Sequence, residues 1–298
     1  MSGVTLREKR IRMVAYYFVI PALLFFILLN AYPLITVVWD SFQLINMLNK
    51  ALSGFAGLSN YVAVLQNENF QAALRHTFVW TLLSVAGEYV FGLMTALALN
   101  QNIRCRALFR GIIIIPWVVP IVIAGMTWTW MLDPNYGIIN YWLVKMGIIA
   151  QPYNWLGEMN TALYTVIFVN IWRSFPFYTI SLLAGLQSVS KDILEAAAID
   201  GAGVRVRFFQ VVLPQLKSIS LTIIFIHLIW TAINFDFIWV MTEGGPLYAT
   251  ETLPIQIFRY AMQTYNFGYA SALASMMLGF MMTAFLLYYF MSVRKMNR

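Results

Sequence analysis

Residues 187–217 have the sequence QSVSKDILEAAAIDGAGVRVRFFQVVLPQLK, and residues 218–241 continue as SISLTIIFIHLIWTAINFDFIWVM. The first part contains charged residues, Gly and Pro, whereas the second holds one carboxylate, Asp236, and no Lys or Arg. An apolar run of about 20 residues is long enough to cross a bilayer core of about 30 Å as a helix. This stretch therefore predicts a polar connector, residues 187–217, that leads into a membrane-spanning helix.

Five other stretches of the chain are equally apolar. Together they predict six transmembrane helices, at about 14–38, 77–99, 111–132, 161–186, 218–241 and 269–291. Each must be helical, because lipid offers no hydrogen-bond partner to free backbone groups. The composition agrees, since hydrophobic residues make up 61% and charged residues 10%, against about 25% charged residues in a typical soluble domain. We expect an all-α polytopic membrane protein with a single transmembrane domain, residues 1–298.

The Lys and Arg residues predict how the chain is oriented in the membrane. Most of the 19 lie in the terminal segments and in the loops near 100–110 and 187–217. The opposite side carries only Lys50, Arg75, Lys145 and Arg259. Because basic loops stay in the cytoplasm, we expect residues 1–13, 187–217 and 292–298 to be cytoplasmic. The formal net charge of +7 is then explained without a nucleic-acid partner.

The polar connector should itself fold as a helix, a turn and a second helix. Ser190 can cap the first helix, and Gly201 or Gly203 can end it in left-handed geometry. Pro214 suits the first turn of the next membrane helix. The small Ala residues at 196–198 would let the backbone of another protein come close, as a docking element requires. An amphipathic connector lying on the lipid headgroups would explain the same residues.

The connector resembles the EAA loop of ATP-binding-cassette (ABC) importer permeases. The residues that match its pattern are Glu195, Ala196, Ala197, Gly201, Leu213 and Pro214, with Asp200 beside the glycine. Three further elements are similar to those of sugar permeases and follow in the same order: residues 57–61, residues 242–246 with Thr250, and residues 266–272. The resemblance covers about 14–298 and is greatest to the maltose-type first permease of carbohydrate importers. It implies the type I permease fold, with the EAA loop as the helix that docks in a cleft of the ATPase subunit.

The sequence contains no motif for chemistry of its own. No Lys follows a Gly, so the Gly-Lys of a phosphate-binding loop is absent. His76 and His227 lie in separate segments, and Cys105 is the single Cys, so we expect no metal site, disulfide or catalytic triad. The chain is therefore predicted not to be an enzyme and to bind no cofactor. ATP and Mg²⁺ would be held by a partner.

The resemblance also implies the partners and the location. They are a second permease subunit in a heterodimer, two copies of an ABC ATPase, an extracytoplasmic sugar-binding protein, membrane lipid and a carbohydrate substrate. The location would be the inner membrane of a bacterial cell, or the cell membrane of an archaeon.

Two helical faces combine polar and aromatic residues inside the predicted spans. Their members follow at i, i+3, i+4 and i+7: Asn170, Arg173, Ser174 and Phe177 in the fourth span, and His227, Trp230, Thr231 and Asn234 in the fifth. Sugar hydroxyls need hydrogen-bond partners, and sugar ring faces stack on aromatic side chains. The resemblance places these eight residues at the substrate positions of the family. The alternative is that they join helices to one another or to the partner subunit.

Two details of these sites stay open at the sequence level. Arg173 could bind an acidic sugar, but an interhelical ion pair with Glu88 or Asp236 is the favoured expectation, because an intramembrane charge is costly. The residues Gly244, Gly245 and Pro246, in a predicted external loop, either contact the binding protein or form a simple turn.

Two other functions are compatible with a membrane bundle. An ion-coupled secondary transporter would use Glu88, Asp236 and His227 as a proton relay. A membrane-embedded enzyme or assembly factor is disfavoured, since no metal or nucleophile motif is apparent.

Overall fold

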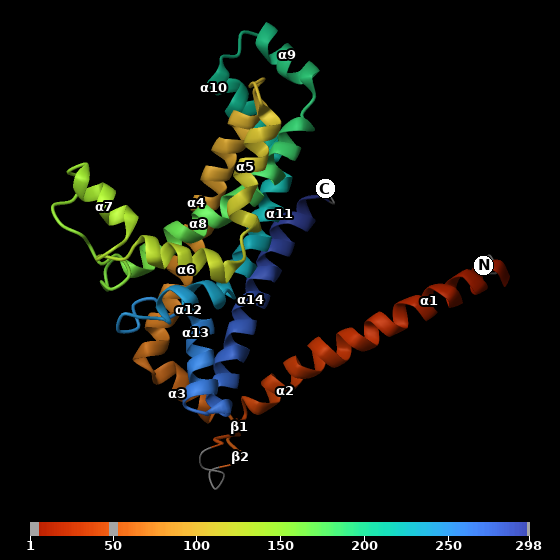
Figure 1. The fold of residues 1–298 in the computed structure, drawn as a ribbon. Helices are drawn as coiled ribbons and strands as arrows, with labels where there is room; N and C mark the ends of the chain where they lie inside the picture. Colours follow the sequence, from red (N-terminus) through yellow and green to blue (C-terminus); the bar gives the residue numbers. More distant parts are fainter. Residues whose placement is uncertain (1–5, 48–52, 297–298) are drawn as a thin grey trace. The chain divides into compact units, whose positions relative to one another are not determined.

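The computed structural model describes residues 6–47 and 53–296 (Figure 1). Lys50, residues 1–5 and residues 297–298, all of which enter the predicted topology, lie outside this part. The described chain is helical apart from one antiparallel pair, β1 (Gln43–Leu44) and β2 (Gly54–Phe55), in which Gln43 lies opposite Phe55. The chain packs as two compact units: the residues up to Asn67 with Ile257–Gly279, and Glu68–Gln256 with the residues from Phe280 on.

The first unit contains the first predicted span. α1 (Leu6–Phe26), a π-helical segment (Ile27–Ala31) and α2 (Tyr32–Asp40) follow without a break, and Tyr16–Asp40 is long and apolar enough to cross a membrane. The unit also holds α3 (Ser59–Gln66), the π-helical segment Arg259–Gln263 and the start of α14 (Phe267–Met296). Asn60 ties α3 to the chain before it by donating to the carbonyl oxygens of Ser41 (2.9 Å) and Gln43 (2.8 Å).

Three long helices form the core of the second unit. They are α4 (Glu68–Asn100), α8 (Ala162–Gln187) and α11 (Leu213–Ala232), which pack against one another. α4 and α8 approach closely at Gly92, where an added Cβ would lie 2.3 Å from the Cβ of Tyr178. Leu182, Leu216 and Ala96 are among the buried residues between them. The second and fourth predicted spans, 77–99 and 161–186, are therefore confirmed as helices, and α4 begins nearer the N-terminus than predicted.

The third predicted span, 111–132, is wrong as a single straight helix. It consists of α5 (Arg106–Val118) and α6 (Ile121–Met131), which meet at an angle of 92°. Val119 is extended, with φ −61° and ψ 129°, because the residue before a proline avoids helical geometry. Pro120 has no N–H to donate to a helix. Pro120 therefore explains why the apolar run 111–132 does not form one helix.

The fifth predicted span, 218–241, has wrong boundaries at both ends. The helix runs from Val204 to Ala232 through α10 (Val204–Arg207), a π-helical segment (Phe208–Val212) and α11. Leu213 N–H bonds to Phe208 O within this run, and the wider π turn accommodates Pro214 inside the helix. Pro214 lies in the first turn of α11, as predicted, although the helical run already begins before it. After Ala232 the chain breaks and starts α12 (Asp236–Thr242), so Asp236 is not within a span.

The remaining helices are short. They are α7 (Ile138–Lys145), α9 (Lys191–Ile199) and α13 (Leu253–Phe258). Within the described ranges, five helices are long and apolar enough to cross a membrane, and the bent pair α5–α6 makes six if it counts as one span. The all-α membrane fold is confirmed. The single-domain division and the cytoplasmic segments stay predictions.

Candidate functional site

A buried polar cluster joins the three core helices of the second unit. Glu88 on α4 is fully buried. One of its carboxylate oxygens accepts from Nδ2 of Asn170 on α8 at 2.9 Å, and the other lies 2.9 Å from Nδ1 of His227 on α11. Asn170 and His227 are also buried. We refer to Glu88, Asn170 and His227 as the Glu88 cluster.

Aromatic side chains enclose His227. The Phe177 ring stacks on it at a centroid distance of 4.6 Å, and Tyr178 meets it edge-on, also at 4.6 Å. Trp230 lies 5.5 Å from the imidazole and is 54% exposed. The aromatic side chains around His227 thus extend from the buried cluster to Trp230 at the surface of the isolated chain.

Several polar atoms in this region have no partner within the described chain. They are Thr81 Oγ1, Ser84 Oγ, Arg173 Nε, Tyr178 OH and His227 Nε2. Thr81, Ser84 and Glu88 share one face of α4, at i, i+3 and i+7. Buried polar atoms are nearly always hydrogen-bonded, so this region is suited to a polar guest such as water or a hydroxylated solute.

The expected ion pair of Arg173 is absent from the part of the chain that the structure describes. There, the one ion pair within 4.0 Å joins His227 to Glu88. Both carboxylate oxygens of Glu88 are engaged by Asn170 and His227, and Asp236 is exposed in the first turn of α12. The charges of Glu88 and Arg173 nevertheless interact, so the expected pairing is present as an electrostatic interaction and not as a direct contact.

The two predicted polar faces come together only in part. Phe177 of α8 stacks directly on His227 of α11, and Asn170 of α8 is linked to His227 through Glu88. Asn234, in contrast, lies beyond the end of α11. The Asn234 side chain accepts from Phe237 N–H at 3.1 Å and so supports the start of α12. Thr231 and Ser174 are buried, and the Thr231 carbonyl accepts from Trp80 Nε1 at 2.8 Å.

The α4 side of the site was not predicted from the sequence. Trp80, Thr81 and Ser84 were not singled out, and Glu88 was considered only as a partner of Arg173 or as part of a proton relay. A pattern was available, since Thr81, Ser84 and Glu88 follow one another at helical spacing in an apolar span. Such a face predicts a polar contact inside the bundle.

The EAA segment has the predicted local geometry. Ser190 caps α9 by accepting from Asp192 N–H at 3.2 Å, and Gly201 is left-handed with φ +78°. α9 and α10 lie together at one end of the second unit (Figure 1). Glu195, Ala196, Asp200 and Gly201 are exposed there and Ala197 is half-buried, while Leu213 is half-buried and Pro214 exposed inside the continuous helix.

Apolar side chains lie on the surface of this turn. Ile199 is 87% exposed and Val204 is 75% exposed. They flank the left-handed Gly201 and the half-buried Ala202. A rigid turn that presents apolar side chains to its surroundings suits docking on another protein.

The loop after α12 is tightly tied. Gly245 N–H donates to Thr242 O at 2.8 Å, and the Thr250 hydroxyl donates to Gly245 O at 2.8 Å. Gly244 is buried, and Gly245 and Pro246 are half-buried. The exposed tip is Leu247 and Tyr248. The predicted binding-protein contact through Gly244, Gly245 and Pro246 stays a prediction, and the tip is the part of this loop that a partner could reach.

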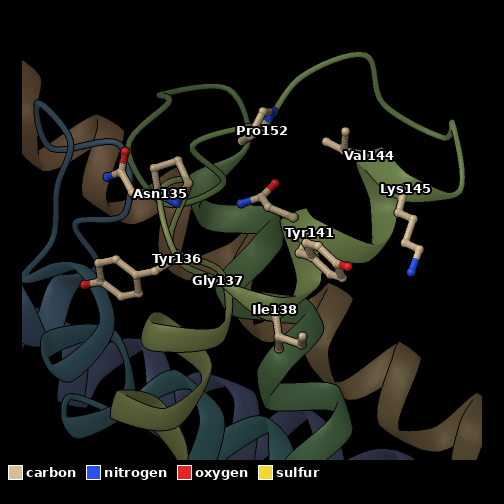
Figure 2. Close-up of a pocket in the computed structure, with 10 residues that line it drawn as sticks. Asn135, Tyr136, Gly137, Ile138, Tyr141, Val144, Lys145 and Pro152 are labelled. Carbon is tan, nitrogen blue, oxygen red and sulfur yellow. The ribbon is translucent and has the colours of Figure 1, made fainter.

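A cavity of about 540 Å³ lies beside α7, away from the Glu88 cluster. Figure 2 shows Tyr136, Tyr141, Lys145 and Pro152 around it. Asn140 supports its wall by donating to Leu132 O and Tyr153 O, both at 3.1 Å, and by accepting from Trp155 Nε1 at 3.1 Å. None of the predicted substrate-binding residues lines this cavity.

Comparisons with known proteins identify the family. Residues 88–297 match the model of the binding-protein-dependent transport system inner membrane component. The chain is 38% identical to the trehalose/maltose transport system permease of Thermococcus litoralis over 72% of this chain and 70% of that protein. It is 31% identical to the sulfoquinovosyl glycerol transport system permease of Agrobacterium fabrum over 89% of this chain and 86% of that one.

A solved structure shares the fold. It is a chain of a bacterial alginate ABC transporter in complex with alginate pentasaccharide-bound periplasmic protein. It matches with a TM-score of 0.84 and 20% identity, over 98% of each chain. With a family model that spans most of its length, this chain belongs to the inner membrane components of binding-protein-dependent transport systems.

Proposed function

We propose that this chain is a permease subunit of an ATP-driven importer for a carbohydrate or carbohydrate derivative. The observation that carries the proposal is the capped and exposed EAA segment, Ser190–Gly201, on a chain of this family. The solute would arrive on an extracytoplasmic binding protein. A second permease subunit would complete the pathway, and two ABC ATPase subunits would hold ATP and Mg²⁺.

The geometry supports a route from the docking surface to the solute pathway. α9 would sit on the ATPase, and Gly201 and Gly203 separate it from α10. The continuous helix Val204–Ala232 carries His227, and with it the contact to Glu88 and Asn170. A movement imposed on α9 would therefore reach the polar centre of the bundle as a rigid-body displacement.

The chemistry around this centre suits a hydroxylated solute. Phe177 and Trp230 offer ring faces, while Thr81, Ser84 and Tyr178 offer hydroxyl groups without partners in the described chain. The related permeases named above serve trehalose, maltose and sulfoquinovosyl glycerol. This range of solutes supports a saccharide or saccharide derivative and leaves its identity to experiment.

The docking role is tested in the complex that this chain forms with its co-purifying partners. Glu195→Lys or Gly201→Asp should abolish ATP-dependent uptake of the solute that the binding protein delivers. The first reverses a charge on the docking surface, and the second strains a residue with φ +78°. Gln210→Ala, at an exposed position in the same connector, residues 187–217, but outside Ser190–Gly201, is the matched control. Normal uptake by both variants in a fully assembled complex would refute the proposal.

One observation favours a second function, an ion-coupled secondary transporter. The buried contact between Glu88 and His227 is a carboxylate–imidazole pair inside a membrane bundle. Asp236, however, does not join it and is exposed on α12. Solute uptake by the chain alone in vesicles, abolished by an uncoupler and independent of ATP, would establish this alternative.

A further inference from the structure

Two arginines of α5 converge on one neutral oxygen at the end of α8. Gln187, with its amide oxygen turned toward them, accepts from Arg106 Nη2 at 3.1 Å and from Arg110 Nη2 at 2.9 Å. Both guanidinium groups keep a buried Nε without a hydrogen-bond partner in the described structure. Two positive charges are thus held side by side with a single shared amide as their acceptor.

This arrangement lacks a negative charge. In the described ranges no carboxylate lies within 4.0 Å of Arg106 or Arg110, since the single ion pair there is that of His227 and Glu88. Arg104, exposed just before α5, adds a third positive charge. Two guanidinium groups that share one acceptor atom repel each other, and an anion between them would relieve this repulsion.

An apolar groove of about 220 Å³ continues from Arg110 and Gln187. It runs between α5 and α8, which pack against each other. Its lining includes Arg110, Ile113, Ile114, Ile180, Leu183 and Gln187. Because Arg110 borders the apolar run of α5, the charged end of the groove lies where the hydrocarbon region is predicted to begin.

We propose that this groove binds one anionic phospholipid of the cytoplasmic leaflet. The phosphate lies between Arg106 and Arg110, and an acyl chain follows Ile113, Ile114 and Ile180. Basic pockets between membrane helices on the cytoplasmic side are known to hold anionic headgroups. A free phosphate ion or a carboxylate from another protein would satisfy the arginines but would leave the apolar groove unexplained. The proposal goes beyond the transport function and does not depend on it.

The test uses the purified full-length chain in detergent and counts retained lipids by native mass spectrometry. Dioleoylphosphatidylglycerol is compared with dioleoylphosphatidylcholine, and inorganic phosphate serves as the free anion. We expect one tightly held phosphatidylglycerol and no retained phosphatidylcholine. Each basic side chain at an anionic headgroup contributes about fivefold in affinity, so Arg106→Gln with Arg110→Gln should weaken phosphatidylglycerol binding about 30-fold.

Two further variants make the result specific. Arg205→Gln with Arg207→Gln removes the same charge from α10, outside the groove, and should leave lipid binding unchanged. Ala184→Trp keeps both arginines and fills the groove at an exposed lining residue, and it should weaken lipid binding by a similar factor to the arginine variant.

Three results would overturn the proposal. Equal loss in the two double-arginine variants would mean unspecific attraction. Full displacement of the lipid by inorganic phosphate, with Ala184→Trp unaffected, would identify a site for a free anion. A carboxylate of a partner chain cross-linked to Arg106 or Arg110 in the assembled complex, with no lipid retained, would identify a protein contact.

Discussion

At the scale of single residues, the contact of Glu88 with His227 should contribute strongly to the free energy of unfolding. Glu88 has no exposure and both of its oxygens are engaged. A hydrogen bond between membrane helices contributes about 0.6 kcal/mol on average, whereas leaving one partner of a buried hydrogen bond unsatisfied costs about 1–3 kcal/mol. The second figure applies here, because the partner left behind stays inside the bundle.

His227→Ala should therefore lower the free energy of unfolding by about 1–3 kcal/mol, measured by thermal unfolding of the purified protein. Thr95→Val removes a hydroxyl contact between α4 and Thr179 of α8 and should cost about 0.6 kcal/mol. Glu88→Gln combined with His227→Ala should cost less than the sum of the two single changes, because the two groups share one interaction. Additive costs would show that the pair is not coupled.

Arg173 has no carboxylate within 4.0 Å in the described chain, and its Nε has no hydrogen-bond partner there. If the solute carries an acidic group, Arg173→Ala should reduce its uptake about tenfold or more, since hydrogen bonds to charged groups contribute about 1.5–3 kcal/mol. Arg173→Lys should retain part of the activity, and the uptake of a neutral analogue should not change. An equal loss for acidic and neutral solutes would indicate a structural role. Rates of ATP-dependent uptake in reconstituted vesicles separate these results.

At the scale of helices, the close contact of α4 with α8 depends on a glycine, which has no side chain. At Gly92 an added Cβ would meet the Tyr178 Cβ at 2.3 Å and the Thr179 backbone nitrogen at 3.1 Å. Backbone and Cβ atoms cannot move aside, in contrast to Gly87, where the nearest atom is the flexible Ile171 Cδ1. The two glycines therefore differ in what a substitution must displace.

Gly92→Ala should lower the free energy of unfolding by about 1–3 kcal/mol, the usual cost of overpacking. Gly111→Ala, on a helix face with nothing within 4 Å, should be neutral or stabilise by up to about 1 kcal/mol through helix propensity. Thermal unfolding of the two variants side by side provides the measurement. A Gly92→Ala protein as stable as Gly111→Ala would show that the helices separate easily at this point.

The helices also show which features of the structure could be predicted from the sequence alone. The spans could be predicted from the length of their apolar runs. The roles of Ser190 as a helix cap and of Gly201 as a left-handed helix end could be predicted from capping rules. Both kinds of prediction depend only on residues that are neighbours in the sequence. The break at Pro120 and the continuation of the helix on the N-terminal side of Pro214 were not predicted. A proline can end a helix, bend it or be absorbed by a π turn, and packing outside the local sequence decides among these. The partners of Glu88 were likewise fixed by the packing of three helices.

At the scale of the whole molecule, the distribution of Lys and Arg predicts how the protein is oriented in the membrane. The arginines near 100–110 and the EAA segment are expected on the cytoplasmic side. Cys105, the single and exposed Cys, lies in the first of these loops and offers a native label there.

A membrane-impermeant maleimide should modify Cys105 in inside-out vesicles and not in right-side-out vesicles. Ile148, exposed in the predicted external loop, supplies the matched control: Cys105→Ser with Ile148→Cys should give the opposite pattern. Gel shift of the labelled protein reports both. Labelling of Cys105 from outside would reverse the predicted topology and place the EAA segment out of reach of any cytoplasmic ATPase.

The unbroken helix from Val204 to Ala232 determines where the chain can tolerate inserted or deleted residues. Each residue turns a helix by about 100°, so a single insertion near Lys217 would swing His227 away from Glu88 while the EAA segment kept its place. An insertion of seven residues would nearly restore the angle but shift the imidazole by about 10 Å along the axis. Length changes at the Gly201–Gly203 turn would leave the angle between the helix and Glu88 untouched. The number of residues between the EAA segment and His227 therefore sets both the direction in which His227 points and its position along the helix axis.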